Sequence, residues 1–178
     1  KSSVDITAKT VTSFAIDDIE PISIAFALDV SGSMGDLTTD GDVKIDVLRD
    51  ATRLLFASLE SGVENTAPLQ TKLRTGFAAY NTDLVEETLM EGGYAGITSD
   101  IDAMVADGGT NSTVALQSAF DMLQNDAGAL SGVKRYIVFM TDGDNNEPIW
   151  DDESVALCKA IKSSDITVYS VAFAAPDK

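Results

Sequence analysis

Three short apolar runs alternate with helical patterns along this chain, and this alternation most constrains its fold. The runs cover 22–28, 136–140 and 166–174, each bounded by polar or glycine-containing segments. Continuous apolar runs of this length are typical of strands buried on both faces of a sheet. Helical spacing of apolar residues is found over 44–59, 97–105, 112–124 and 152–163. The pattern therefore predicts an α/β fold with a doubly wound, mostly parallel sheet and helices on both faces.

Two further segments read as strands. The residues of 71–80 and 84–90 predict a strand pair around a turn at 81–83. Apolar residues alternate with polar ones over 1–19, which predicts an N-terminal β extension. We expect this extension to precede one domain over 20–178, since 178 residues suit a single domain.

Composition excludes several functions. The formal net charge is −17, from 29 acidic and 12 basic residues, which opposes binding to nucleic acid or to an anionic membrane by this domain. The chain has no histidine, which excludes Ser-His-Asp catalysis and histidine-ligated zinc. Asp29 lacks the second carboxylate, two residues on, that aspartate-based phosphoryl transfer needs, because Ser31 stands there. We therefore expect that the protein is not an enzyme.

The single cysteine, Cys158, excludes a disulfide within the chain. It lies in a helical pattern beside alanine and leucine, so one interpretation is a buried thiol. The alternative is a disulfide with a cysteine beyond Lys178 in a longer parent protein. No segment has the roughly 18–20 apolar residues that would span a bilayer.

The first apolar run leads directly into Asp29-Val-Ser31-Gly-Ser33. One carboxylate and two hydroxyls at alternate positions can converge on a hard cation such as Mg²⁺, which prefers oxygen ligands in octahedral geometry. Because these three groups cannot fill that shell, other ligands must come from the chain, from water or from a partner. The alternative is a turn in which the Asp and Ser side chains cap backbone groups.

Two more residues are candidate ligands. Thr110 follows a glycine pair, and Asp142 follows the second apolar run within Thr-Asp-Gly. Ligands of doubly wound sheets bind outside the carboxyl ends of the strands, where the strand order reverses, so we expect these side chains to meet there. The loop that follows holds Asp144, Asn145 and Asn146. We interpret these three as rim residues that shape partner choice, against the alternative of a solvated loop.

Together these residues resemble the metal-ion-dependent adhesion site of von Willebrand factor A domains, and the resemblance extends from about Ile22 to Ala174. It implies that Ser31, Ser33 and Thr110 contact the metal directly. Asp29 and Asp142 would then bind mainly through water, and an Asp or Glu of a protein partner would complete the shell. The implied metal is Mg²⁺, with Mn²⁺ or Ca²⁺ as alternatives. The family also implies one antiparallel edge strand and a further C-terminal helix, which we expect this chain to lack.

The sequences of segments 27–34, 134–143 and 157–169 resemble those of bacterial proteins of the tight-adherence (Tad) pilus-assembly type. This likeness implies an extracytoplasmic domain (periplasmic, cell-surface or secreted) within a longer, membrane-anchored protein. A cysteine downstream, as such proteins tend to have, would suit Cys158. We therefore predict a metal-dependent protein-binding or adhesion module of a bacterial envelope or pilus system. The alternatives are a structural element whose metal only stabilises loops, and a cytoplasmic subunit that works with an ATPase.

Overall fold

One mixed sheet forms the centre of the computed structural model, which describes residues 20–61 and 71–172. Its strand order is β3-β2-β1-β4-β5, and β2, β1, β4 and β5 are parallel. The strands are β1 (Ile22–Asp29), β2 (Leu73–Tyr80), β3 (Leu84–Gly92), β4 (Lys134–Thr141) and β5 (Ile166–Ala172). Because β3 pairs antiparallel with β2 at one edge, the predicted sheet class is confirmed. The predicted β extension over 1–19 lies outside the described residues.

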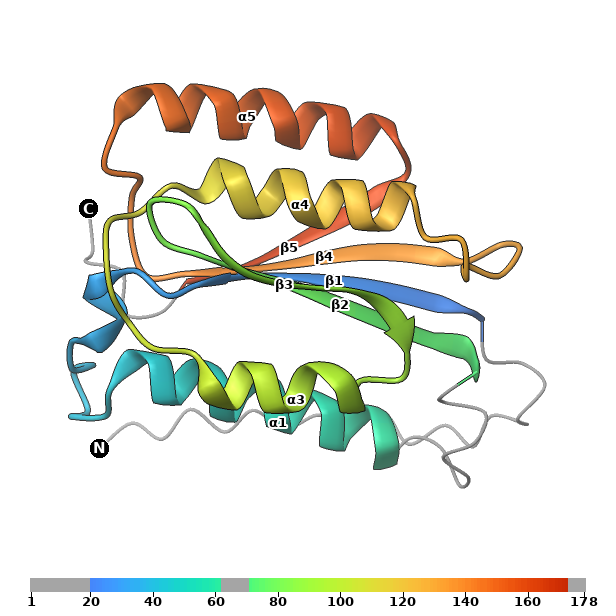
Figure 1. The fold of residues 1–178 in the computed structure, drawn as a ribbon, viewed down its shortest axis with the longest axis horizontal. Helices are drawn as coiled ribbons and strands as arrows, with labels where there is room; N and C mark the ends of the chain where they lie inside the picture. The colour runs from blue at the N-terminus through green and yellow to red at the C-terminus, as the bar shows by residue number, and fades with distance from the viewer. Residues whose placement is uncertain (1–19, 62–70, 173–178) are drawn as a thin grey trace.

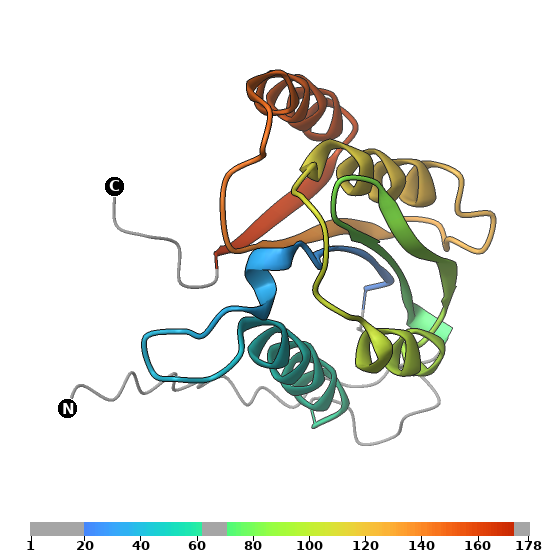
Figure 2. The same cartoon turned by 60° about the vertical axis from the view of Figure 1, so that its left-hand side comes forward.

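Helices cover both faces of the sheet, as predicted (Figures 1 and 2). On one face lie α1 (Lys44–Ser61) and α3 (Ala95–Ala103), and on the other lie α4 (Ser112–Gln124) and α5 (Pro148–Ser163). None of the helices in the described part of the chain is long and apolar enough to cross a membrane.

The two faces of β1 pack differently, because successive side chains of a strand point to opposite faces. Phe26 and Leu28 belong to the core on the α1 and α3 side, and neither is exposed. Ala25 and Ala27 belong to the core on the α4 side, together with Ala115 and Ala119 of α4. These small side chains let α4 pack closely on this face of the sheet.

The structure corrects some predicted boundaries and faces. Helix α5 begins at Pro148, four residues before the predicted start, because proline suits the first position of a helix. The helical spacing over 97–105 places Val105 on the same face as Ile97 and Ile101, but Val105 is 74% exposed because α3 ends at Ala103. The helical spacing over 44–59 places Leu54 on the apolar face of this helix, but Leu54 is 68% exposed. The buried face of α1 includes the fully buried Thr52, and residues two apart on a helix point in nearly opposite directions.

Candidate metal centre

The candidate site lies where the strand order of the sheet reverses. The chain passes from β1 through α1 to β2 on one side of β1, while β4 pairs with β1 on the other side. Asp29 is the last residue of β1, and Asp142 directly follows the last residue of the neighbouring β4. This is the position at which doubly wound sheets form ligand sites, as predicted from the order of the elements.

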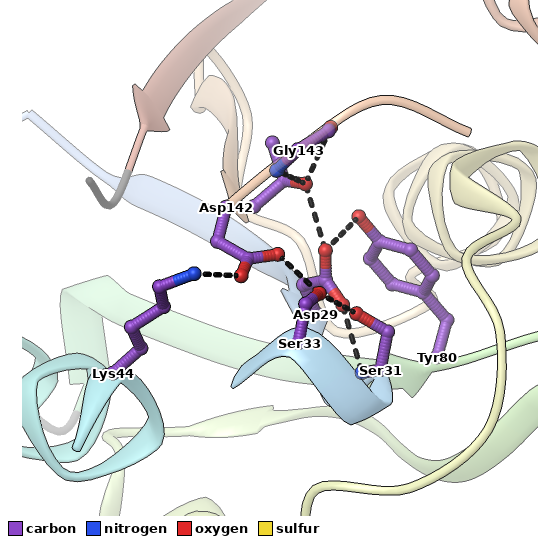
Figure 3. Close-up of polar contacts among 8 residues, drawn as sticks. Asp29, Ser31, Ser33, Lys44, Tyr80, Asp142 and Gly143 are labelled. Atoms are coloured by element: carbon purple, nitrogen blue, oxygen red, sulfur yellow. Dashed lines mark hydrogen bonds and ion pairs between the residues drawn. The ribbon is translucent and has the colours of Figure 1, made fainter. Parts of the chain in front are cut away.

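Asp29 is completely buried, with 0% of its surface exposed, and all of its hydrogen-bond donors are uncharged (Figure 3). Its Oδ1 accepts the Ser31 backbone N–H at 2.8 Å. Its Oδ2 accepts the hydroxyls of Thr141 at 2.7 Å and Tyr80 at 3.3 Å. A buried carboxylate is costly unless its charge is balanced, so this environment suits a nearby cation.

Tyr80 is held at this position by the sheet, because it ends β2 and is the register partner of Asp29. Burial raises the pKa of the Tyr80 phenol well above its usual value of 10.0, and the negative charge of Asp29 raises this pKa further. Both effects favour the protonated phenol. Tyr80 therefore acts as a hydrogen-bond donor to the carboxylate.

The two serines connect Asp29 to Asp142. The backbone after β1 forms a short 3₁₀ helix, Gly32–Gly35, and the Ser31 and Ser33 hydroxyl oxygens lie 3.1 Å apart. The Ser33 hydroxyl donates to Asp142 Oδ1 at 2.9 Å. Ser31 is buried and Ser33 is exposed, so Ser33 links this buried polar group to the solvent.

Asp142 also forms an ion pair that the sequence analysis missed. The ammonium of Lys44, the first residue of α1, lies 2.7 Å from Asp142 Oδ2. The side chains are 12% and 1% exposed, respectively. The two residues lie 98 positions apart, so no local pattern indicates their contact.

Thr110 lies in the adjacent loop, which hydrogen bonds attach to the rest of the site. The Gly32 N–H donates to the Gly108 carbonyl at 2.9 Å, which joins the two loops. Gly108 has a φ of +80°, and a Cβ there would lie 2.7 Å from the Asn81 amide nitrogen, so glycine is required. Thr110 is buried at 6% exposure. The structure thus joins four of the predicted residues in one network and places the fifth in a loop bound to it.

Asn145 and Asn146, in the loop after β4, bind the backbone of the Thr110 loop and of α4, a role that the sequence did not predict. The Asn146 side-chain oxygen accepts the Thr110 N–H at 2.7 Å, and the Asn146 N–H donates to the Thr110 carbonyl at 3.0 Å. The Asn145 side-chain oxygen accepts the Ser112 N–H at 2.6 Å. Both side chains therefore hold the Thr110 loop and the start of α4 in place. Asp144 is exposed, and its role as a rim residue that shapes partner choice stays a prediction.

The donor chemistry of the site suits a hard cation. Two carboxylates and the hydroxyls of two serines meet here, and Thr110 adds a third hydroxyl in the adjoining loop. Within 20–61 and 71–172 no three His, Cys, Asp or Glu side chains cluster in a way that could hold a metal. The residues therefore offer an all-oxygen site with few charged ligands, which fits Mg²⁺ or a similar ion and not a soft metal.

Comparison with known families identifies the chain. Residues 23–178 match the model of the von Willebrand factor type A domain, so the protein belongs to this family. Domains of the family mediate protein–protein interactions, are generally not enzymes and often bind divalent metals. No curated protein matches the chain in sequence.

Solved structures show the same fold at low identity. An aerotolerance-related membrane protein from Bacteroides fragilis is 24% identical with a TM-score of 0.63, over 85% of this chain and 67% of that one. The vWF domain of the type V pili tip protein Mfa5 from Porphyromonas gingivalis is 18% identical with a TM-score of 0.55, over 70% and 38%. Manganese-loaded Plasmodium vivax TRAP protein is 15% identical with a TM-score of 0.58, over 86% and 57%. The chain therefore spans from 38% to 67% of these three proteins.

Proposed function

We propose that this domain is a metal-dependent protein-binding module. The cation, Mg²⁺ in the first instance, is held by Asp29, Ser31, Ser33, Thr110 and Asp142. An Asp or Glu side chain of a protein partner completes the coordination shell. The observation that carries the proposal is the fully buried Asp29 carboxylate, which has only uncharged donors and lies beside two serine hydroxyls and Asp142.

The ligand set also supports the role of the partner. Hydroxyls do not reduce the charge of a bound cation, so a site rich in hydroxyls leaves the metal able to attract an anion. Ser33 is exposed, so a partner can reach this edge of the site from solvent. When bound, the metal supplies an electrostatic anchor for a carboxylate, and the protein residues orient it.

The alternative is a structural role in which the metal only ties loops together. Hydrogen bonds between protein groups join these loops directly: the Gly32 N–H donates to the Gly108 carbonyl, and the Thr110 and Ser112 N–H groups donate to the Asn146 and Asn145 side chains. The protein itself therefore supplies connections between the loops. This observation favours partner binding over the structural role.

We further propose an extracytoplasmic location in a bacterial envelope or pilus system. Support comes from the likeness to Tad pilus-assembly proteins, and from structural relatives described as a membrane protein and a pili tip protein. Fractionation of cells that express the full gene distinguishes this location from the cytoplasm. Recovery in the cytoplasm with an ATPase would instead support the alternative of a cytoplasmic subunit.

The test of the metal site is calorimetric titration of chelator-stripped protein with Mg²⁺ and with Mn²⁺. Ser33→Ala is the most informative variant, because Ser33 is exposed and its loss disturbs little packing. We expect at least the 10- to 100-fold loss of affinity that even indirect metal-site contacts commonly produce. Ser99→Ala, which changes an exposed serine of α3, is the matched control and should bind like the parent.

A second titration tests the carboxylate. Metal affinity is measured in excess acetate and in chloride at equal ionic strength and equal free metal concentration. Acetate should tighten metal binding if the cation accepts a carboxylate, since coupling between two ligands is reciprocal. No saturable metal binding would refute the proposal. Metal binding that raises thermal stability but does not respond to acetate would favour the structural role.

A further inference from the structure

We propose that Lys44 sets the charge of the metal centre, so that the metal-loaded site requires an anionic ligand. The inference rests on the metal site of the proposed function and adds to it a residue that determines ligand preference. Lys44 contacts Asp142, and both side chains are largely buried, so their charges act together on the site.

The two oxygens of Asp142 have different partners. Oδ1 accepts the Ser33 hydroxyl at 2.9 Å, and Oδ2 contacts the Lys44 ammonium at 2.7 Å. Figure 3 shows that Lys44 approaches the carboxylate from α1, on the side away from the serines. The ammonium therefore does not occupy the side of the carboxylate that faces the hydroxyls. Lys44 and a bound cation can be present together.

Burial makes the charge of Lys44 effective. Its side chain is 12% exposed, and the carboxylate it contacts is 1% exposed. Its backbone N–H donates to the Asp36 carbonyl at 3.0 Å, which fixes the start of α1 at this position. Partly buried charges are screened much less by water and salt than exposed ones. The charge of Lys44 therefore acts on the site strongly.

The charges then determine what the site binds. In the described part of the chain, Asp29 and Asp142 are the buried charged residues. With Lys44 they leave one net negative charge, and a divalent cation turns this into one net positive charge. A single carboxylate from a partner would neutralise it. Without Lys44 the metal-loaded site would already be neutral, and the attraction for an anion would be weaker.

The consequence is a coupling between metal and anion. Lys44 repels the cation, so it weakens metal binding when no anion is present. It also attracts an incoming carboxylate, so it strengthens ligand binding once the metal is bound. If the ion pair were purely structural, the opposite effect on metal affinity would be expected. Removal of the pair would then misplace Asp142 and weaken metal binding.

The experiment compares three variants. Lys44→Gln removes the charge and keeps a hydrogen-bond donor, whereas Lys44→Arg keeps the charge. Lys134→Gln removes the same charge from an exposed lysine at the first residue of β4, at the opposite end of that strand from Asp142. Metal affinity is measured by calorimetry in chloride and in excess acetate, and thermal unfolding reports the fold of each variant.

We expect Lys44→Gln to bind Mg²⁺ or Mn²⁺ about fivefold more tightly in chloride, at the low end of couplings between sites. The tightening of metal binding by acetate should largely disappear in this variant. Lys44→Arg and Lys134→Gln should both retain the behaviour of the parent.

Each other outcome has a defined meaning. Weaker or unchanged metal binding by Lys44→Gln, with the parent binding normally, would overturn the inference and leave the proposed function intact. If the parent binds no metal, the proposed function itself fails. If Lys44→Gln fails to fold while Lys44→Arg folds, Lys44 is a structural ion-pair partner and the inference is wrong.

Discussion

Thr141→Val tests whether the buried Asp29 carboxylate depends on its uncharged donors. Valine has nearly the same shape as threonine, so the change removes a hydroxyl with little effect on packing. The change removes the 2.7 Å hydrogen bond from the Thr141 hydroxyl to Asp29 Oδ2. It also removes a 3.3 Å bond from the exposed Gly143 N–H to the Thr141 hydroxyl oxygen, which water can replace. The acceptor is fully buried, so no water can take the place of the hydroxyl without rearrangement.

The structure sets the size of the expected effect. Hydrogen bonds to charged groups contribute roughly 1.5–3 kcal/mol, so we expect the free energy of unfolding to fall by about 2 kcal/mol. For a chain of 178 residues this corresponds to a decrease in Tm of roughly 4–8 °C. Tyr80→Phe should cost less, because the Tyr80 contact with Asp29 is longer, at 3.3 Å.

Urea unfolding of chelator-stripped protein measures this effect, with Thr52→Val as the matched control. Thr52 is fully buried, and its hydroxyl donates at 2.9 Å to the Leu48 carbonyl, an uncharged acceptor within α1. That carbonyl keeps its helical N–H partner, so the control should cost less than about 1 kcal/mol. If Thr141→Val costs no more than Thr52→Val, the idea that donors stabilise a buried charge at Asp29 is refuted.

Two further predictions concern Gly108 and Cys158. Gly108→Ala should lower the free energy of unfolding by about 1–2 kcal/mol in urea, because its φ is +80° and a Cβ would lie 2.7 Å from the Asn81 side chain. Gly143→Ala, where a Cβ meets nothing within 4 Å, is the control, and an equal loss in both would contradict the argument. Burial raises the pKa of the Cys158 thiol, so less thiolate is present at a given pH. Its alkylation by iodoacetamide should therefore rise at higher pH than that of glutathione, and matching pH profiles would show that burial has no effect.

Local pattern predicted much of the fold. The apolar run before Asp29 became β1, and the spacing over 112–124 became α4 with the same bounds. These predictions succeeded because burial of one face imposes a period on the sequence. The predictions for Val105 and Leu54 were wrong, because Val105 lies beyond the end of α3 and Leu54 lies on the solvent side of α1. Residue spacing alone does not show where a helix ends or which of its sides faces the core.

The candidate site was only partly accessible from the sequence. Asp29, Ser31 and Ser33 are close along the chain, and Asp142 follows a strand, so the strand-end rule could bring them together. Tyr80 and Lys44 were missed, although both contact a predicted residue. No local pattern indicated these two residues. Thr141, in contrast, lies beside Asp142 in the Thr-Asp-Gly motif, and it donates to Asp29.

The sequence by itself determined the order of strands and helices and the oxygen-bearing residues at the strand ends, because hydrophobic periodicity and motif spacing are local properties. Only the tertiary structure decided the electrostatics of the centre. The register of β1 with β2 places Tyr80 beside Asp29, and the packing of α1 brings Lys44 to Asp142 across 98 positions. Charges act through space and not along the chain, so their balance at the site depends on the assembled sheet and helices.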